Sequence, residues 1–186
     1  MENKNNNFET MIKPVIVLTV IALICSALLA VTNNVTAPII AENERITTLN
    51  AYAQVLQGVD DPNTLEEIDG ITTANVAAAV KTEDGQIAVK STASGYDGGV
   101  ITNILGFDAD GNIQGIYSDC STQTAGMGSK CDDESFTSQF VGLSAANELT
   151  LNQDVQQVSG CTVSSKAFVA AVNAAIDCFN EVKGAA

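Results

Sequence analysis

Glycine and small hydroxyl residues crowd together in one short segment near the end of the sequence, residues 158–166 (VSGCTVSSK). A helical stripe of apolar residues follows directly, so the segment leads into a helix. The first turn of a helix offers unpaired backbone N–H groups and the positive end of the helix dipole, which suit a phosphate group. Lys166 adds positive charge there. The competing interpretation is an ordinary helix start after a glycine turn, with Ser164 or Ser165 as the N-cap.

Several kinds of site are excluded by the residues that the chain lacks. Histidine is absent, so Ser-His and Cys-His catalytic pairs and histidine-ligated metals are excluded within this chain. The five cysteines include no C-x-x-C spacing, and the acidic turn at 108–112 lacks the later glutamate of a calcium loop. We therefore predict no metal site, and a hydrolase would have no visible general base. Cys120 and Cys131 bracket a loop of small residues, as either a disulfide or two free thiols.

The negative charge is concentrated in one part of the chain. The net charge is −14, and residues 1–40 contribute nothing to it because two acidic and two basic residues balance there. Residues 41–186 hold the other twenty acidic and six basic residues. Such a domain repels nucleic acid, which we exclude as a partner, and it would also repel a free anionic cofactor.

An apolar run of seventeen residues from Val15 to Val31 predicts a transmembrane anchor, which we place at residues 14–32. A cleaved signal peptide is the alternative, but the run is long for one and no A-x-A site follows. Ile24 before Cys25 fits lipoprotein cleavage poorly. The lysines of the predicted cytoplasmic tail, residues 1–13, favour an inside N-terminus and an acidic domain outside the cytoplasm.

The rest of the sequence predicts an α+β domain in which an antiparallel sheet packs against helices. A linker helix at residues 33–57 leads into a domain at 58–186, which begins with an acidic loop at 58–72. A short helix is expected around Phe136, Phe140 and Leu143, before the C-terminal helix. Strands are expected at Asn75–Lys81, Gln86–Thr92, Val100–Phe107 and Ile113–Tyr117, joined in pairs by turns at 83–85 and 108–112.

Three segments resemble the FMN-binding domain family, in the order in which that family has them. Ser159-Gly160-Cys161-Thr162 resembles its Ser/Thr-Gly-Ala-Thr signature. Residues 95–99 (GYDGG) resemble its Gly-Tyr-x-Gly turn, and residues 122–128 (TQTAGMG) resemble its Glu-Thr-Pro-Gly-Leu-Gly loop, which lies near the flavin. The sequence departs from the family where Gln156 replaces an aspartate before the signature and where Gln123 and Ala125 replace glutamate and proline.

The resemblance implies a covalent flavin. In the family a flavin transferase joins FMN through its phosphate to the last threonine of the signature, which is Thr162 here. The other cofactor-binding residues that it implies are Ser159, Gly160, Cys161, Gln123, Thr124, Ala125, Gly126 and Met127. Covalent attachment would also hold an anionic cofactor on a domain that repels it.

Among such proteins, the chain length and single anchor are similar to the G subunits of Rnf-type complexes, which couple ferredoxin:NAD electron flow to Na⁺ or H⁺ transport. This likeness implies a redox subunit of a translocase, without independent catalytic activity. The implied partners are other membrane subunits, including a second flavin subunit and iron–sulfur subunits. The alternatives are a C-subunit-like part of a Na⁺-translocating NADH:quinone reductase, a stand-alone flavin carrier outside the cytoplasm, and a membrane-tethered binding protein without flavin.

Overall fold

The computed structural model describes residues 12–185, which form two compact units divided between Thr47 and Thr48. The first unit consists of most of a single 43-residue helix, α2 (Lys13–Val55), which continues without a break through Pro38. By length and composition α2 is able to cross a membrane, and its apolar stretch is not buried in the protein. Most of the predicted tail, residues 1–11, lies outside the described residues, and the boundary between anchor and linker helix stays a prediction.

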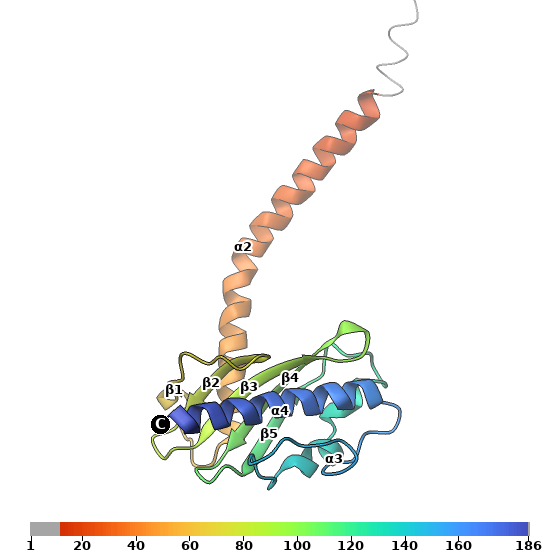
Figure 1. Ribbon diagram of the computed structural model, residues 1–186. Coiled ribbons are helices and arrows are strands. Elements are labelled where there is room, and N and C mark those ends of the chain that lie inside the picture. The colour runs from red at the N-terminus through yellow and green to blue at the C-terminus, as the bar shows by residue number, and fades with distance from the viewer. Residues whose placement is uncertain (1–11, 186) are drawn as a thin grey trace, which may run out of the picture. The chain divides into compact units, whose positions relative to one another are not determined.

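The second unit is built on a five-stranded antiparallel sheet in which every strand pairs with its neighbour in sequence (Figure 1). The strands are β1 (Glu66–Glu67), β2 (Val76–Lys81), β3 (Ile87–Ser94), β4 (Val100–Phe107) and β5 (Ile113–Asp119). Four of them confirm the predicted strands, with ends shifted by at most two residues. Both predicted turns are present, and the carboxylate of Asp108 closes the second by accepting from the backbone N–H and side-chain amide of Asn112.

Strand β1 corrects the prediction of a loop over 58–72, which also contains the 3₁₀ turn η2 (Pro62–Thr64). Two residues are too few to give a sequence pattern. Glu66 pairs with Lys81 in register, and the Lys81 ammonium lies 3.1 Å from the Glu66 carboxylate. Both side chains are at least half exposed, so the ion pair stabilises this sheet edge only weakly.

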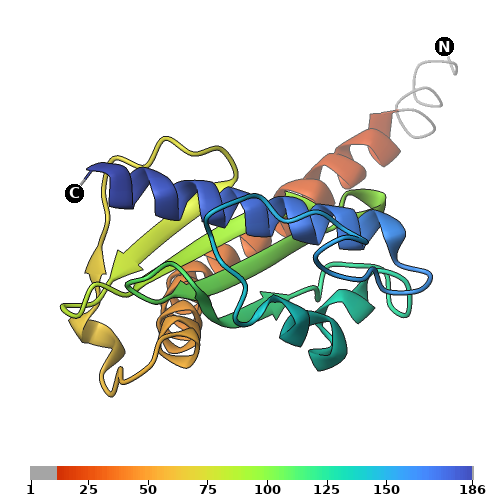
Figure 2. The same ribbon diagram turned by 60° about the horizontal axis from the view of Figure 1, so that its bottom comes forward.

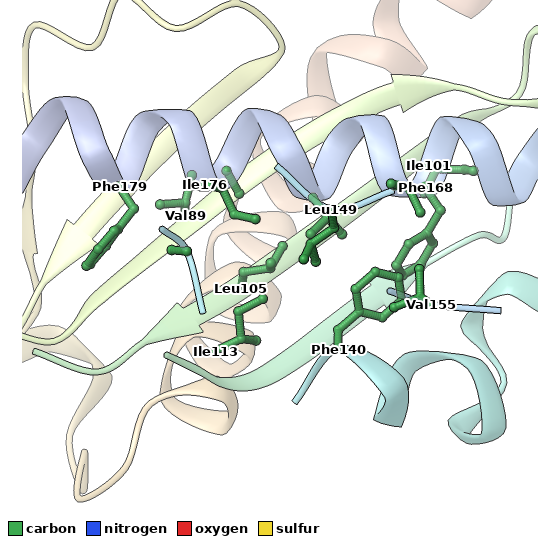
Figure 3. Close-up of a cluster of buried hydrophobic side chains, with 14 of the residues drawn as sticks. Val89, Ile101, Leu105, Ile113, Phe140, Leu149, Val155, Phe168, Ile176 and Phe179 are labelled. Carbon is green, nitrogen blue, oxygen red and sulfur yellow. The ribbon is translucent and has the colours of Figure 1, made fainter. Parts of the chain in front are cut away.

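The long helix α4 (Thr162–Ala185) lies across one face of the sheet, over β3 and β4 (Figure 2). The side chains between them form the main core, part of which Figure 3 shows. Phe168 reaches from α4 to Phe136 and Phe140, with ring centroids 5.0 and 5.3 Å away. These two rings come from α3 (Glu134–Thr137) and the adjoining 3₁₀ turn η5 (Ser138–Phe140), which confirm the predicted short helix, although Leu143 lies beyond its end.

The opposite face of the sheet is covered by the last turns of α2. Ala51, Tyr52 and Val55 form a second buried cluster with residues of β2, β3 and β4, among them Ile104. Along β4, Ile101 and Leu105 belong to the main core and Ile104 to the second cluster, as alternation along a strand requires. The middle of the sheet is therefore covered on both faces, by α4 on one and by the end of α2 on the other.

Candidate functional site

The C-terminal helix begins at Thr162, three residues after Ser159. Gly160 has a φ of +80°, a conformation that glycine adopts at no steric cost, and it turns the chain into the helix. The first helical hydrogen bond runs from Ser165 N to Cys161 O at 2.8 Å. The N–H groups of Thr162, Val163 and Ser164 therefore precede that bond and are available to a ligand.

The predicted N-caps, Ser164 and Ser165, are wrong because the helix starts earlier and encloses both of them. They are almost completely buried, and their hydroxyl groups bond other segments instead of the helix start. The Ser164 hydroxyl donates to Oε1 of Gln123 at 2.9 Å, and Ser165 Oγ accepts from Val158 N at 3.3 Å. The two serines thus fix the helix start against the loops before it.

A cavity of about 210 Å³ opens at this helix start. Its lining residues come from the start of α4 and from the two loops that carry family-like motifs, and they are Tyr96, Met127, Gly160, Cys161, Thr162, Val163 and Ser164. Tyr96, Met127 and Val163 are 41, 45 and 53% exposed, so large apolar side chains border an open cavity. The available N–H groups and Lys166, one turn into the helix, give this end a positive character suited to a phosphate.

Four of the nine predicted cofactor-binding residues line the cavity, namely Met127, Gly160, Cys161 and Thr162. Gln123 lies behind the lining and is buried, and the other four, Ser159, Thr124, Ala125 and Gly126, do not line the cavity. The three lining residues that sequence reasoning missed are Tyr96, Val163 and Ser164. Tyr96 belongs to the GYDGG turn, and Val163 and Ser164 directly follow Thr162. Including whole motifs and their immediate neighbours among the candidate residues would have found all three.

Two glycine-containing turns place the facing side chains. In the turn after β3, Gly95 N donates to Gly99 O at 2.7 Å, and Asp97 and Gly98 both have positive φ. In the loop after β5, the N–H groups of Met127 and Gly128 both donate to Thr124 O, which brings Met127 to the cavity. Thr122 ties the two segments together by donating to Val100 O at 2.6 Å.

Gln156, the departure before the signature, is exposed and lies outside the cavity lining. Its backbone is held by the side chain of Gln139, which accepts from Gln156 N at 2.7 Å and donates to Gln156 O at 3.3 Å. The replacement of aspartate by Gln156 therefore changes a surface position next to the signature and leaves the cavity wall unchanged.

Three cysteines lie in the main core near this site, and all are free thiols in the structure. Cys161 lines the cavity, while Cys120 and Cys131 are fully buried. Burial raises the pKa of Cys120 to about 11 and that of Cys131 to about 12. The sequence left open whether Cys120 and Cys131 form a disulfide or remain two free thiols, and in the structure they are free thiols.

We expect the thiols of Cys120 and Cys131 to resist alkylation in the folded protein. With a pKa of about 12, about one Cys131 thiol in ten thousand is ionised at pH 8, and only the thiolate reacts. Peptide mapping after iodoacetamide treatment should find both cysteines unmodified in the folded protein and alkylated in the protein unfolded in urea. Rapid modification of the folded protein would contradict this burial.

Comparisons with known proteins agree on both parts of the chain. Residues 1–55 match the family described as the RnfG N-terminal region, and residues 95–177 match the FMN-binding domain. The G subunit of an ion-translocating oxidoreductase complex from Shewanella piezotolerans is 28% identical over 94% of this chain and 92% of its own length. The G subunit of the Na⁺-translocating ferredoxin:NAD⁺ oxidoreductase complex from Acetobacterium woodii is 28% identical over 98% of this chain and 99% of its own.

Among solved structures, that of Shewanella oneidensis NqrC aligns with a TM-score of 0.46 and 17% identity, over 73% of this chain and 74% of the other. The match to the FMN-binding domain includes the helix start, both glycine-containing turns, and the strands β4 and β5 between those turns. Residues 95–177 match the FMN-binding domain family, and over nearly its whole length the chain is homologous to the G subunits of ion-translocating oxidoreductase complexes.

Proposed function

We propose that this chain is the membrane-anchored flavin subunit of an Rnf-type complex, and that its FMN is esterified through the phosphate to Thr162. In such a complex it passes electrons along a route between ferredoxin and NAD that drives Na⁺ or H⁺ transport. Its partners are then other membrane subunits, including a second flavin subunit and iron–sulfur subunits, and a flavin transferase. In this proposal the N-terminus lies in the cytoplasm and the flavin domain lies outside it, as the lysines before the apolar run favour.

The position of Thr162 is the observation that carries the proposal. Thr162 is the first residue of α4, its side chain is exposed, and it borders the cavity. A phosphate on its hydroxyl group would lie beside the N–H groups of the first turn and the positive end of a 24-residue helix. The apolar side chains of Tyr96, Met127 and Val163 provide a surface for an aromatic ring beside that phosphate.

FMN, when attached, supplies the electron-transfer chemistry. The start of α4 would hold the phosphate of that FMN. The serines at 164 and 165 keep the cavity walls in place, and apolar side chains cover one side of the site. Covalent attachment would also hold FMN against electrostatic repulsion, because residues 41–186, which carry the whole net charge of −14, would repel the free anion.

The test is the intact mass of the protein extracted from membranes of cells that contain the flavin transferase, measured after denaturation. The wild type should carry FMN less one water, about 440 Da, as a covalent adduct. Thr162→Ala should lack the adduct, whereas Thr150→Ala, at an exposed threonine away from the cavity, should retain it. An unmodified wild type would contradict covalent attachment and favour a binding subunit without flavin.

A further inference from the structure

Gln123 is buried directly behind the cavity, and two residues of the cavity lining depend on it. Only 6% of its surface is exposed. Its Oε1 accepts hydrogen bonds from the backbone N–H of Tyr96 at 3.2 Å and from the hydroxyl of Ser164 at 2.9 Å. One amide oxygen thus joins the turn after β3 to the first turn of α4, although Tyr96 and Ser164 lie 68 positions apart in the sequence. The Ser164 hydroxyl oxygen is a second, longer acceptor for the same Tyr96 N–H, at 3.4 Å.

Three glycines from both loops make room for this one side chain. A Cβ at Gly95 or Gly128 would lie 2.5 Å from Oε1 of Gln123, and a Cβ at Gly99 would lie 2.6 Å from its Nε2. A side chain at any of these three positions would force the Gln123 amide to move. Gly95 and Gly99 belong to the GYDGG turn and Gly128 ends the TQTAGMG loop, so both motifs keep glycine where they enclose the amide.

The amide is uncharged, and its nitrogen has no hydrogen-bond partner among residues 12–185. A buried charge acts over longer distances than an exposed one, because the surroundings screen it poorly. A glutamate here would keep an oxygen for Tyr96 and Ser164 but would place negative charge directly behind the proposed flavin site. The structure therefore separates two contributions of Gln123, its acceptor oxygen and its neutrality.

We propose that Gln123 is a positioning residue of the flavin site, which fixes Tyr96 and Ser164 through its amide oxygen and keeps the site free of buried negative charge. The second part rests on the proposed function. The first part concerns the protein alone and holds with or without flavin. Two measurements therefore address them separately.

Hydrogen exchange of the Tyr96 amide tests positioning in a Thr162→Ala background, where no flavin is attached. Gln123→Met has a similar length without the acceptor and should speed exchange at Tyr96 by about fivefold to tenfold, the effect of one lost hydrogen bond. Gln123→Glu retains an acceptor and should exchange as slowly as the parent. Gln157→Met, at an exposed glutamine, is the control. Unchanged exchange in Gln123→Met would overturn positioning.

The midpoint potential of attached FMN tests neutrality. Gln123→Glu should lower the potential, because added negative charge disfavours gain of an electron, whereas Gln157→Glu on the surface should change it far less. Equal potentials in wild type, Gln123→Glu and Gln157→Glu would overturn this part. A wild type without FMN would instead contradict the proposed function, and the exchange measurement would still decide whether Gln123 positions Tyr96.

Discussion

Removal of residues 1–47 is expected to release the protein from the membrane as a folded, soluble domain. The compact unit that begins at Thr48 contains both hydrophobic clusters, including the last turns of α2 that cover the second face of the sheet. The deleted part carries the exposed apolar side chains of α2, such as Leu18 and Leu29, which water disfavours and a bilayer accommodates. The full chain should remain in the membrane pellet after alkaline carbonate extraction, and the shortened chain should appear in the supernatant.

A substitution within the anchor tests the same point without loss of chain. Leu23→Lys near the middle of the run should cost about 3 kcal/mol of insertion and reduce the membrane-bound fraction, because a charged side chain is costly at a bilayer centre. A shortened chain that begins at residue 56 would be a poor control, because it also lacks Tyr52 and Val55, which belong to the second buried cluster of the domain. If the mass of the mature wild type shows that the N-terminal residues, including the apolar run, have been removed, this would contradict the anchor and favour a signal peptide.

The strands and the C-terminal helix were predictable because their side chains follow a clear period. Strand β4 appears at the predicted bounds, and its turn to β5 is marked by Asp108 and Gly111. By contrast, β1 consists of two exposed glutamates whose only signal is their pairing with β2. Pairing between distant segments leaves no trace in local composition, so such an edge strand escapes prediction from pattern.

The site was predictable as a segment but not as a set of contacts. The hydroxyl residues around Thr162 indicated a helix start, yet local rules favoured Ser164 or Ser165 as the cap. Their hydroxyl groups bond Gln123 and Val158 instead, and those partners are visible only once the loops are folded. Gln123 illustrates the same limit, because the motif predicts that it lies near the flavin, but only the fold places it behind the cavity lining.

Gly106→Ala is expected to destabilise the domain by about 3 kcal/mol, the upper part of the range for overpacked cores. A Cβ at Gly106 would lie 2.0 Å from the backbone oxygen of Val55 and 2.7 Å from its carbonyl carbon. These are backbone atoms in the last turn of α2, so no side-chain rotation relieves the clash. Either α2 must move away from β4, or the strand must move from its neighbours. Urea unfolding of the full chain in mild detergent measures the loss.

Two other glycines give graded controls for this prediction. Gly115 pairs with Gly106 across β4 and β5, but its Cβ would lie 3.1 Å from Val55 Cα, so Gly115→Ala should cost less. Gly184 in α4 has open space around it, and Gly184→Ala should be neutral or slightly stabilising because alanine favours a helix. Equal stability of Gly106→Ala and wild type would show that Val55 does not approach β4 this closely.

The position of Gly106 also predicts what its substitution should spare. The end of α2 rests near the C-terminal end of β4, whereas Val100 at the other end of that strand contacts Thr122 in the loop that leads to the cavity. Gly106 and Val100 lie six positions apart on this extended strand, a distance of about 20 Å. The support of α2 and the support of Thr162 are therefore separate parts of one sheet. Gly106→Ala should lower the stability of the domain, while the folded fraction still carries its flavin adduct. Thr162→Ala should lose the adduct and leave the stability of the domain unchanged.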